Sequence, residues 1–579
     1  MKRFLCLGAV LFLCVFWAGC GDVFRPIIIP NPPQFPNPAA VHTVVTLGNN
    51  GTATTGGAGV PAENPLPGSA MVIDNSGDSV VSIKSIGLNP VHAVLQSSSD
   101  ALVVNQSVVT DQTPLSGTCV VTIDGQNFNV CPTLTKLQFS GTTINNTSTI
   151  TLPPNSAANF VATTESSEAY VSLPNLFLDP VNHPSAATVA VVNTTNNSMT
   201  TEVMVGNNPI AMAETPDGTK LYVANQGSQG IPSTWTISAF NTKPSMSTRT
   251  ICDPTGTKCP PPLGSAPIWI SARSDSQQVY VLESNGTLAY LNTSLTGSDT
   301  FAETGIDVPG AAYMWYDTIL NRLYIPGGSQ LVIVDVSQSA PTVLATIDIP
   351  AFAILPTGTT APATAVAVTS LPDGSRAYVG SFAVLPSDFT ISSVSGDGTT
   401  ATYAYTLTAG HDLTPGVTVS ITGTGFDGTF LVAGVVSGTS ACPGRCFQVP
   451  NATSGTGTAG SGTGSNIFPQ VTVVDTTSNT KKPGSVGIPG FPDATNSSYA
   501  SGIYYVPACA STRFRFTMAA AGDSSRAYLG NCDGGNVNII YTTTDTYAEN
   551  VAAPGSVRNP IPPSIQNPPQ NPTFIFAGP

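Results

Sequence analysis

The sequence predicts an all-β protein built from repeated groups of strands. Only 9% of the 579 residues are charged, and Gly, Pro, Ser, Thr and Asn occupy much of the chain. This composition suits many short strands joined by turns. Helical periodicity is almost absent after the first twenty residues. In addition, one strand–turn–strand pattern recurs along most of the chain, and such repetition is typical of modular folds.

The clearest copy of this pattern lies at residues 208–226. Residues 216–218 (Pro-Asp-Gly) predict a turn, because Pro presets φ, Asp bonds back to the backbone and Gly accepts a positive φ. Residues 220–225 (Lys-Leu-Tyr-Val-Ala-Asn) then predict a strand. We expect Tyr222 and the following Val to pack between repeats and Asp217 to form the turn, so this stretch is interpreted as scaffold.

Two elements alternate along the chain. A turn followed by an aromatic or apolar strand occurs at 97–106, 165–173, 216–225, 274–283, 317–326, 372–381 and 522–531. An apolar strand that ends near a polar turn occurs at 71–75, 189–195, 331–337, 471–477 and 537–543. Each repeat thus supplies about four strands in roughly 45 to 55 residues, as a β-propeller blade does. A lone blade leaves both faces exposed, so we expect the blades to close into a ring.

The run Lys220-Leu-Tyr-Val-Ala-Asn225 resembles the YVTN-type β-propeller repeat, named for its Tyr-Val-x-Asn residues. The resemblance covers about residues 70 to 550, less one insertion, and implies a seven-bladed β-propeller related to the lactonase-like superfamily. The repeats leave a count of eight open. Either residues 537–547 complete the first blade, or Thr573-Phe-Ile-Phe576 forms a weak eighth.

Residues 1–19 have the pattern of a signal peptide, with Lys2-Arg3, an apolar run at 4–17 and small residues before Cys20. The run is shorter than the roughly 20 residues that a membrane span needs. Ala-Gly-Cys20 resembles a bacterial lipobox, although Trp17 occupies a position that is usually aliphatic. The resemblance implies lipidation of Cys20, which would anchor the protein durably in a membrane. An ordinary cleaved signal or an uncleaved anchor is the alternative.

Pro-rich segments flank the repeats. We interpret residues 20–40 as a lipidated tether, because dense prolines favour extended polyproline II structure, and residues 554–579 as a Pro-rich C-terminal tail. The propeller occupies residues 41–386 and 467–553. Between these two parts, residues 387–466 have a strand pattern of their own. We expect a small β-sandwich or barrel inserted in a blade loop, either as a binding surface or as a passive decoration.

The cysteines after Cys20 form pairs of sequence neighbours, which favours structural disulfides in an exported protein. The expected pairs are Cys119–Cys131, Cys252–Cys259, Cys442–Cys446 and Cys509–Cys532. The sequence contains no Cys-x-x-Cys motif, and no pair has a nearby His. Metal binding or redox chemistry is therefore the weaker interpretation.

The remaining signals concern function. A net charge of −14 without a basic run argues against nucleic-acid binding. The histidines are scattered, at His42, His92, His183 and His411. No local catalytic, metal or cofactor motif occurs, so we predict no cofactor and lean against an enzyme.

The sequence favours an exported, lipid-anchored propeller that contacts a membrane through its lipid. We expect it to bind a protein or glycan as a scaffold of the cell envelope, in the outer membrane and periplasm or at the cell surface. One alternative, implied by the resemblance, is a lactonase-like or other propeller hydrolase. The other is a purely structural envelope component.

Overall fold

The computed structural model describes residues 43–49, 52–53, 64–65, 68–107, 119–123, 126–129, 131–165, 167–354, 359–410, 412–413, 417–439, 442–488, 491–492, 499–501, 504–506, 514–532, 536–552 and 571–578. This part of the chain contains strands, turns and one 3-10 helix, η1 (Pro232–Thr234). None of its helices is long and apolar enough to cross a membrane. The expected signal peptide, the tether and Cys20 lie outside the described residues.

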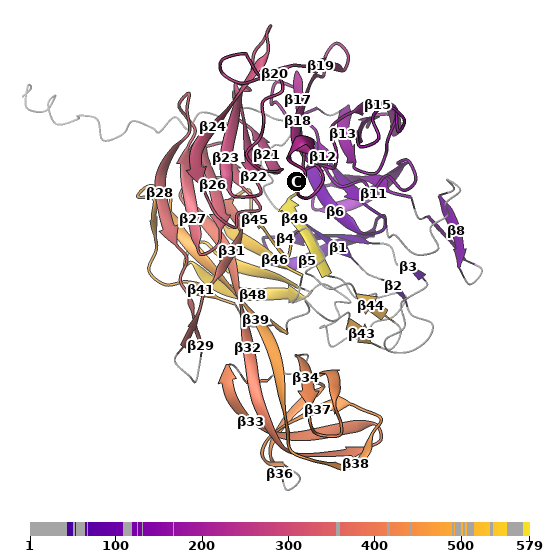
Figure 1. Cartoon of the computed structure of the whole chain (residues 1–579), viewed down its shortest axis with the longest axis vertical. Coiled ribbons are helices and arrows are strands. Elements are labelled where there is room, and N and C mark those ends of the chain that lie inside the picture. Colours follow the sequence, from indigo (N-terminus) through magenta and orange to yellow (C-terminus); the bar gives the residue numbers. More distant parts are fainter. Residues whose placement is uncertain are drawn as a thin grey trace, which may run out of the picture.

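Radially arranged sheets form a ring (Figure 1). Seven sheets of four or five strands are separate blades, and a curled twelve-stranded sheet completes the ring and continues into the insert. The predicted all-β propeller with an inserted β module is therefore confirmed. The base of the curled sheet fills an eighth position, because its inner strand contacts the blades on either side.

The strands of each blade follow one another outward from the axis. The first four blades are β49 (Asn571–Ala577), β1 (Thr43–Asn49), β4 (Ser69–Asp74) and β5 (Ser79–Ser85); β6 (Pro90–Leu95), β7 (Asp100–Asn105), β10 (Thr133–Ser140) and β11 (Thr143–Thr151); β12 (Val161–Ala162), β13 (Glu168–Leu173), β14 (Thr188–Asn193) and β15 (Ser198–Met204); and β16 (Pro209–Glu214), β17 (Lys220–Asn225), β18 (Thr236–Asn241) and β19 (Ser247–Arg249).

The remaining positions repeat this order. They are β21 (Pro267–Ala272), β22 (Gln278–Glu283), β23 (Thr287–Asn292) and β24 (Asp299–Asp307), with β20 (Ile251–Cys252) added outside; β25 (Trp315–Asp317), β26 (Arg322–Gly327), β27 (Gln330–Asp335) and β28 (Thr342–Asp348); β31 (Thr364–Ser370), β32 (Arg376–Asp397) and β39 (Gly460–Asp475), edged by β40 (Thr480–Lys481), β41 (Val486–Gly487) and β42 (Phe491–Pro492); and β45 (Phe516–Ala520), β46 (Arg526–Asn531), β47 (Asn536–Tyr541) and β48 (Thr546–Ala552).

The C-terminal strand β49 closes the ring. It pairs antiparallel with β1, with Phe576 opposite Val45 and Phe574 opposite Leu47. The expectation of a tail over residues 554–579 is therefore wrong for β49, whose apolar side chains join the core of the first blade. Residues 537–547 do not complete the first blade, because β47 lies in the last blade. Residues 573–576 lie in β49, which completes the first blade.

The predicted turns form through local hydrogen bonds. Asp217 Oδ1 accepts the backbone N–H of Thr219 at 3.1 Å, and Gly218 has a φ of +64°. Asp373 accepts the N–H of Ser375 in the same way at 2.9 Å. The prediction that Asp217 is a turn former is confirmed, since its carboxylate replaces a backbone acceptor within the turn.

The Tyr of each repeat packs in the core, as predicted. Six of these side chains are at most 1% exposed, and each lies in the second strand of its blade: Tyr170, Tyr222, Tyr280, Tyr324, Tyr378 and Tyr528. The first blade places β1 at this position, and β1 has no Tyr. In addition, no hairpin turn precedes β1, because its inner neighbour β49 comes from the C-terminus, and this explains why the repeats in the sequence suggest seven units while the ring has eight positions.

Basic side chains fasten neighbouring blades together. The Arg322 guanidinium donates to the Thr476 carbonyl at 2.6 Å. Arg376 and Asp545 form an ion pair at 3.1 Å across the next boundary. Arg526 pairs with Asp78 at 3.2 Å and thereby joins the last blade to the first. In each case an Arg at the start of a second strand contacts the outer turn of the following blade.

The two faces of the ring differ because successive strands are antiparallel. The connections from first to second and from third to fourth strands are short turns, and we call this side the turn face. The opposite side, the loop face, carries the insertions of the described part. They are the sheet of β2 (Thr52–Ala53), β3 (Asn64–Pro65), β43 (Tyr499–Ser501) and β44 (Tyr504–Val506); the hairpin of β8 (Val120–Ile123) and β9 (Gln126–Asn129); η1; the hairpin of β29 (Phe352–Ile354) and β30 (Thr359–Ala361); and the inserted module.

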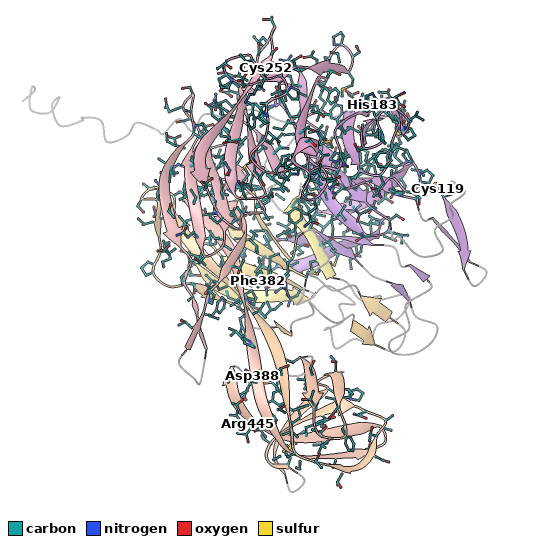
Figure 2. All side chains as sticks on the ribbon, in the orientation of Figure 1. Cys119, His183, Cys252, Phe382, Asp388 and Arg445 are labelled. Carbon is teal, nitrogen blue, oxygen red and sulfur yellow. A yellow bond between two sulfur atoms is a disulfide. The ribbon has the colours of Figure 1, made fainter. Side chains whose placement is uncertain are left out.

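The module extends from the ring on two unbroken strands, β32 and β39 (Figure 1). Figure 2 marks this path from Phe382, beside the ring, to Asp388 and then to Arg445 on the module. Around the ends of these strands curl β33 (Thr400–Gly410), β34 (Thr418–Thr422), β35 (Gly428–Leu431), β36 (Gly434–Thr439), β37 (Cys442–Pro450) and β38 (Ser454–Gly457). The module has a core of its own, in which Tyr403 and Phe447 stack with ring centroids 4.9 Å apart.

Candidate functional site: the axial cavity

Aromatic side chains from six blades meet at the axis of the ring and form a closed circuit of ring contacts. We call this set the axial aromatic cluster. Its successive centroid distances are His92–Phe160 3.7 Å, Phe160–Trp269 5.7 Å, Trp269–Tyr313 4.8 Å, Tyr313–Phe514 6.2 Å, Phe514–Phe574 5.8 Å and Phe574–His92 4.9 Å. Aromatic pairs at such separations stabilise one another beyond simple burial of area.

Local irregularities of the innermost strands help to form this cluster. The pairing of β6 with β7 shifts between Pro90 and His92, and that of β21 with β22 shifts between Pro267 and Trp269. Such a bulge adds one residue to a strand and redirects the side chain that follows. The proline beside each bulge lies at the start of an edge strand, where its missing N–H costs little. His92 and Trp269 therefore hold equivalent positions in two blades.

Beside the cluster lies a cavity of about 380 Å³. Its wall is formed by β6, β25, β31, β45 and β49, which are the innermost strands of five blades, together with Tyr313 and Phe514 of the cluster. At the turn face the wall includes Pro372 and Gly522. The cavity thus follows the axis of the ring from the aromatic cluster toward the turn face, and we call it the axial cavity.

The wall of the axial cavity is largely apolar, and its described residues include no charged side chain. Phe516, Met518 and Phe576 are among its larger members. Hydroxyl groups are its main polar feature. The indole N–H of Trp315 donates to Ser370 Oγ at 2.9 Å, so that hydroxyl already has a partner.

Three further hydroxyls of wall residues have no hydrogen bond within the described part of the chain, namely those of Tyr313, Thr369 and Thr517, and the Thr369 hydroxyl is fully buried. Burial raises the pKa of the Tyr313 phenol above its ordinary value. The phenol therefore keeps its proton at any physiological pH. It can donate a hydrogen bond to a molecule in the cavity, because a neutral phenol is both donor and acceptor.

Carboxylates with strongly raised pKa values occur in the ring, but not in the wall of the cavity. Burial raises the pKa of Glu283, at the end of β22, to about 7, and the charge of Glu303 adds to this effect. Burial likewise raises the pKa of Glu214, at the end of β16, to about 7. Across the described residues, no three His, Cys, Asp or Glu side chains are grouped so that they could hold a metal ion. Among the described residues, neither of these two carboxylates lines the axial cavity.

The residues predicted from the sequence lie elsewhere. Three expected disulfides are confirmed: Cys119–Cys131, Cys252–Cys259 and Cys442–Cys446. Cys532 is disulfide-bonded, and its expected partner Cys509 lies outside the described residues. Cys119 and Cys252 lie far from the module, at the periphery of the ring (Figure 2).

The four histidines lie in different parts of the chain. His92 joins the axial aromatic cluster, where its Nδ1 accepts the backbone N–H of Val161 at 3.5 Å. His183 is exposed in a loop. His42 and His411 lie outside the described residues. The inserted module, expected as a binding surface or a passive decoration, carries a hollow lined by residues 405–409 together with Gly444 and Arg445.

The sequence analysis missed the axial aromatic cluster. A weak signal exists, because an aromatic residue follows two positions after a proline in both Pro90-Val-His92 and Pro267-Ile-Trp269. Other members of the cluster precede their strands rather than lying in them, as Phe160 and Phe514 do. No common spacing therefore relates all of these residues, and only closure of the ring brings them together.

The architecture places the chain in the class of β-propellers. No family model and no curated protein matches the sequence. Several solved structures match its fold. AztD from Citrobacter koseri matches at 7% identity and a TM-score of 0.44, covering 93% of this chain and 98% of the other.

Two further structures have comparable likeness. A functionally unknown protein from Desulfotomaculum acetoxidans matches at 10% identity and a TM-score of 0.37, covering 76% of this chain and 96% of the other. Hydrazine synthase from Kuenenia stuttgartiensis matches at 14% identity and a TM-score of 0.35, covering 68% and 86%. At such low identity these likenesses concern the fold and carry no argument about activity or ligand.

Proposed function

We propose that this protein is a lipid-anchored, exported propeller that serves as a binding scaffold of the cell envelope. The observation that carries the proposal is the asymmetry of the ring. The turn face is closed by short turns, whereas the loop face bears the extra sheet, the hairpins and the module on its two-stranded stalk. Loops on a rigid scaffold are a common place for binding surfaces.

Disulfides support export, because such bonds persist in oxidising compartments outside the cytoplasm. The apolar wall of the axial cavity favours a binding role over the hydrolase alternative. A sugar lactone carries several hydroxyls, each of which needs a hydrogen-bond partner when buried. The described residues of the wall offer few such groups and include no carboxylate that could act as a general base.

Metabolic labelling with radioactive palmitate in a bacterial host tests the anchor. We expect the wild-type protein to incorporate label and to sediment with membranes, and the Cys20→Ala variant to lose both properties. Cys14→Ala is the matched control, because this cysteine lies within the expected signal peptide and would be removed with it. Equal labelling of wild type and Cys20→Ala would show that Cys20 is not the lipid site.

A further inference from the structure

We infer that the axial cavity binds an uncharged, planar and largely apolar molecule that offers one hydrogen-bonding group to the Tyr313 hydroxyl. This inference rests on the binding role proposed above, but it is independent of lipid attachment at Cys20. It assigns a ligand class to a site inside the ring, whereas the loop face serves contacts with larger partners.

The size of the cavity sets the size of the ligand. Small-molecule sites enclose roughly 300–1,000 Å³ and combine apolar walls with a few polar groups. The axial cavity, at about 380 Å³, lies at the lower end of this range. A molecule of about two fused rings therefore suits it better than a polysaccharide or a peptide.

The composition of the wall excludes a charged ligand. Among the residues that the structure describes, no Asp, Glu, Lys, Arg or His lines the axial cavity. A charged group transferred into such a site would lose its hydration without gaining a counterion, which is strongly unfavourable. Phosphorylated sugars, nucleotides and carboxylic acids are disfavoured on this ground.

The shape of the wall favours a flat ligand. Trp315, Phe516 and Phe576 contribute aromatic rings to it, and Tyr313 and Phe514 connect it to the axial aromatic cluster. Offset-stacked and edge-to-face contacts with these rings stabilise a planar apolar molecule beyond the burial of its area. The small residues Ala93, Ala367 and Ala519 on neighbouring strands leave the space in which such a molecule can lie.

The Tyr313 hydroxyl gives the site its one directional contact. Tyr313 lines the cavity, and its hydroxyl has no hydrogen-bond partner within the described part of the chain. Thr517, on β45, is a second hydroxyl of the same wall without such a bond. A ligand with a hydroxyl or carbonyl group satisfies at least one of them, while a purely apolar ligand leaves both without a partner.

Equilibrium dialysis of the purified protein with three matched probes tests the inference. The probes are 1-naphthol, naphthalene and 1-naphthalenesulfonate, which share a two-ring frame and differ in their polar group. We expect 1-naphthol to bind most tightly and the sulfonate to bind at least about tenfold more weakly, because its charge finds no partner. Equal binding of the sulfonate, or no binding of 1-naphthol, would overturn the inference.

Two variants locate the site. Tyr313→Phe removes only the hydroxyl, so we expect it to weaken 1-naphthol binding by about five- to tenfold and to leave naphthalene binding unchanged. Ala577→Trp places a large side chain on a half-buried wall position of β49 and is expected to weaken both probes. Ala302→Trp, on β24 outside the cavity, is the matched control. Thermal unfolding of each variant shows that it is folded.

If 1-naphthol binds equally well to wild type and Ala577→Trp, its site lies elsewhere and the inference is wrong. If naphthalene binding falls together with 1-naphthol in Tyr313→Phe, the hydroxyl does not provide the directional contact. These outcomes are distinct from failure of the palmitate experiment, which concerns only Cys20. If the protein incorporates palmitate but binds no probe, the proposed membrane anchor is supported and the inferred ligand site is wrong.

Discussion

The ring and the inserted module are both built from antiparallel strands, but they stabilise those strands differently. A blade of the ring buries its faces against neighbouring blades, and its Tyr side chains lie in cores shared between sheets. The module instead curls one sheet around its own core, which contains Phe389, Tyr403 and Phe447. Stability of the ring therefore depends on its closure, whereas stability of the module depends on local packing.

The largest expected effect comes from opening the ring. Deletion of residues 571–579 removes β49, leaves β1 without its inner partner and takes Phe574 and Ile575 out of the core. Each buried apolar side chain of this size contributes about 1.5–3 kcal/mol. We expect the ring to lose several kcal/mol of unfolding free energy or to remain unfolded, while the module keeps its own transition.

Fluorescence and calorimetry separate the two regions. Trp235, Trp269 and Trp315 all lie in the ring, and the module contains no Trp, so Trp emission follows the ring alone. Ile575→Ala gives a milder version of the same change and should lower only the ring transition. If the calorimetric transition of the module shifted equally, the two regions would form one cooperative unit, contrary to the comparison.

The same contrast explains what the sequence could predict. The second and third strands of the blades could be predicted from the sequence, because they recur together with local turn residues such as Asp217 and Gly218. β1 was missed as a repeat because no hairpin turn precedes it, since its inner neighbour β49 comes from the C-terminus. β49 follows a Pro-rich stretch, and its place is set by pairing with residues more than 500 positions earlier in the chain. The amino-acid composition near the C-terminus therefore does not predict that β49 pairs with β1.

The candidate site was harder to predict from the sequence than the fold. His92, Phe160 and Trp269 meet only because three blades converge on one axis. Their spacing along the chain is irregular, and each residue alone has the character of an ordinary core residue. The Tyr313 hydroxyl could be identified as a candidate binding group only from the structure, which shows no hydrogen bond to it within the described residues. The candidate site at the axis is therefore formed by closure of the ring, which local sequence patterns do not encode.

Glu283 gives a prediction of intermediate size, because it breaks the repeat within the ring. Equivalent positions at the ends of second strands hold Asn105 and Asn225, and Asn225 Nδ2 donates to Ser238 Oγ at 2.9 Å. Glu283 lies beneath Gly264 instead, with Glu303 nearby. Its burial, at 0% exposure, raises its pKa from 4.5 to about 7.

The sign of the pH dependence follows from this shift. Between about pH 4.5 and 7 the folded protein holds a proton on Glu283 that the unfolded chain releases, so stability falls as pH rises through this window. We expect Glu283→Gln to remove this fall and to raise the unfolding free energy at pH 8 by roughly 1–3 kcal/mol. Trp-monitored urea unfolding at pH 5 and pH 8 measures it. A variant with the wild-type pH profile would contradict the assignment. Glu303→Gln removes only the smaller contribution to the shift and should leave most of the fall in place.

The smallest expected effect concerns the ion pairs of the two regions. Arg526 and Asp78 join the last blade to the first, with side chains 19% and 6% exposed, and the guanidinium also lies 4.0 Å from the centroid of the Tyr541 ring. On the module, Arg445 and Asp412 form a pair whose side chains are 52% and 39% exposed. Partial burial reduces screening by water and salt, so the ring pair should couple more strongly.

Double-mutant cycles measure that difference. For Arg526→Met with Asp78→Asn we expect a coupling of about 1–2 kcal/mol that persists in high salt, because the pair is shielded from solvent. For Arg445→Met with Asp412→Asn we expect about 0–0.5 kcal/mol, which salt should abolish. Equal coupling energies for the two pairs would mean that ring closure does not strengthen the Arg526–Asp78 ion pair. A larger coupling on the ring would show that closure, which brings Asp78 and Arg526 together from opposite ends of the propeller, also determines how strongly they interact.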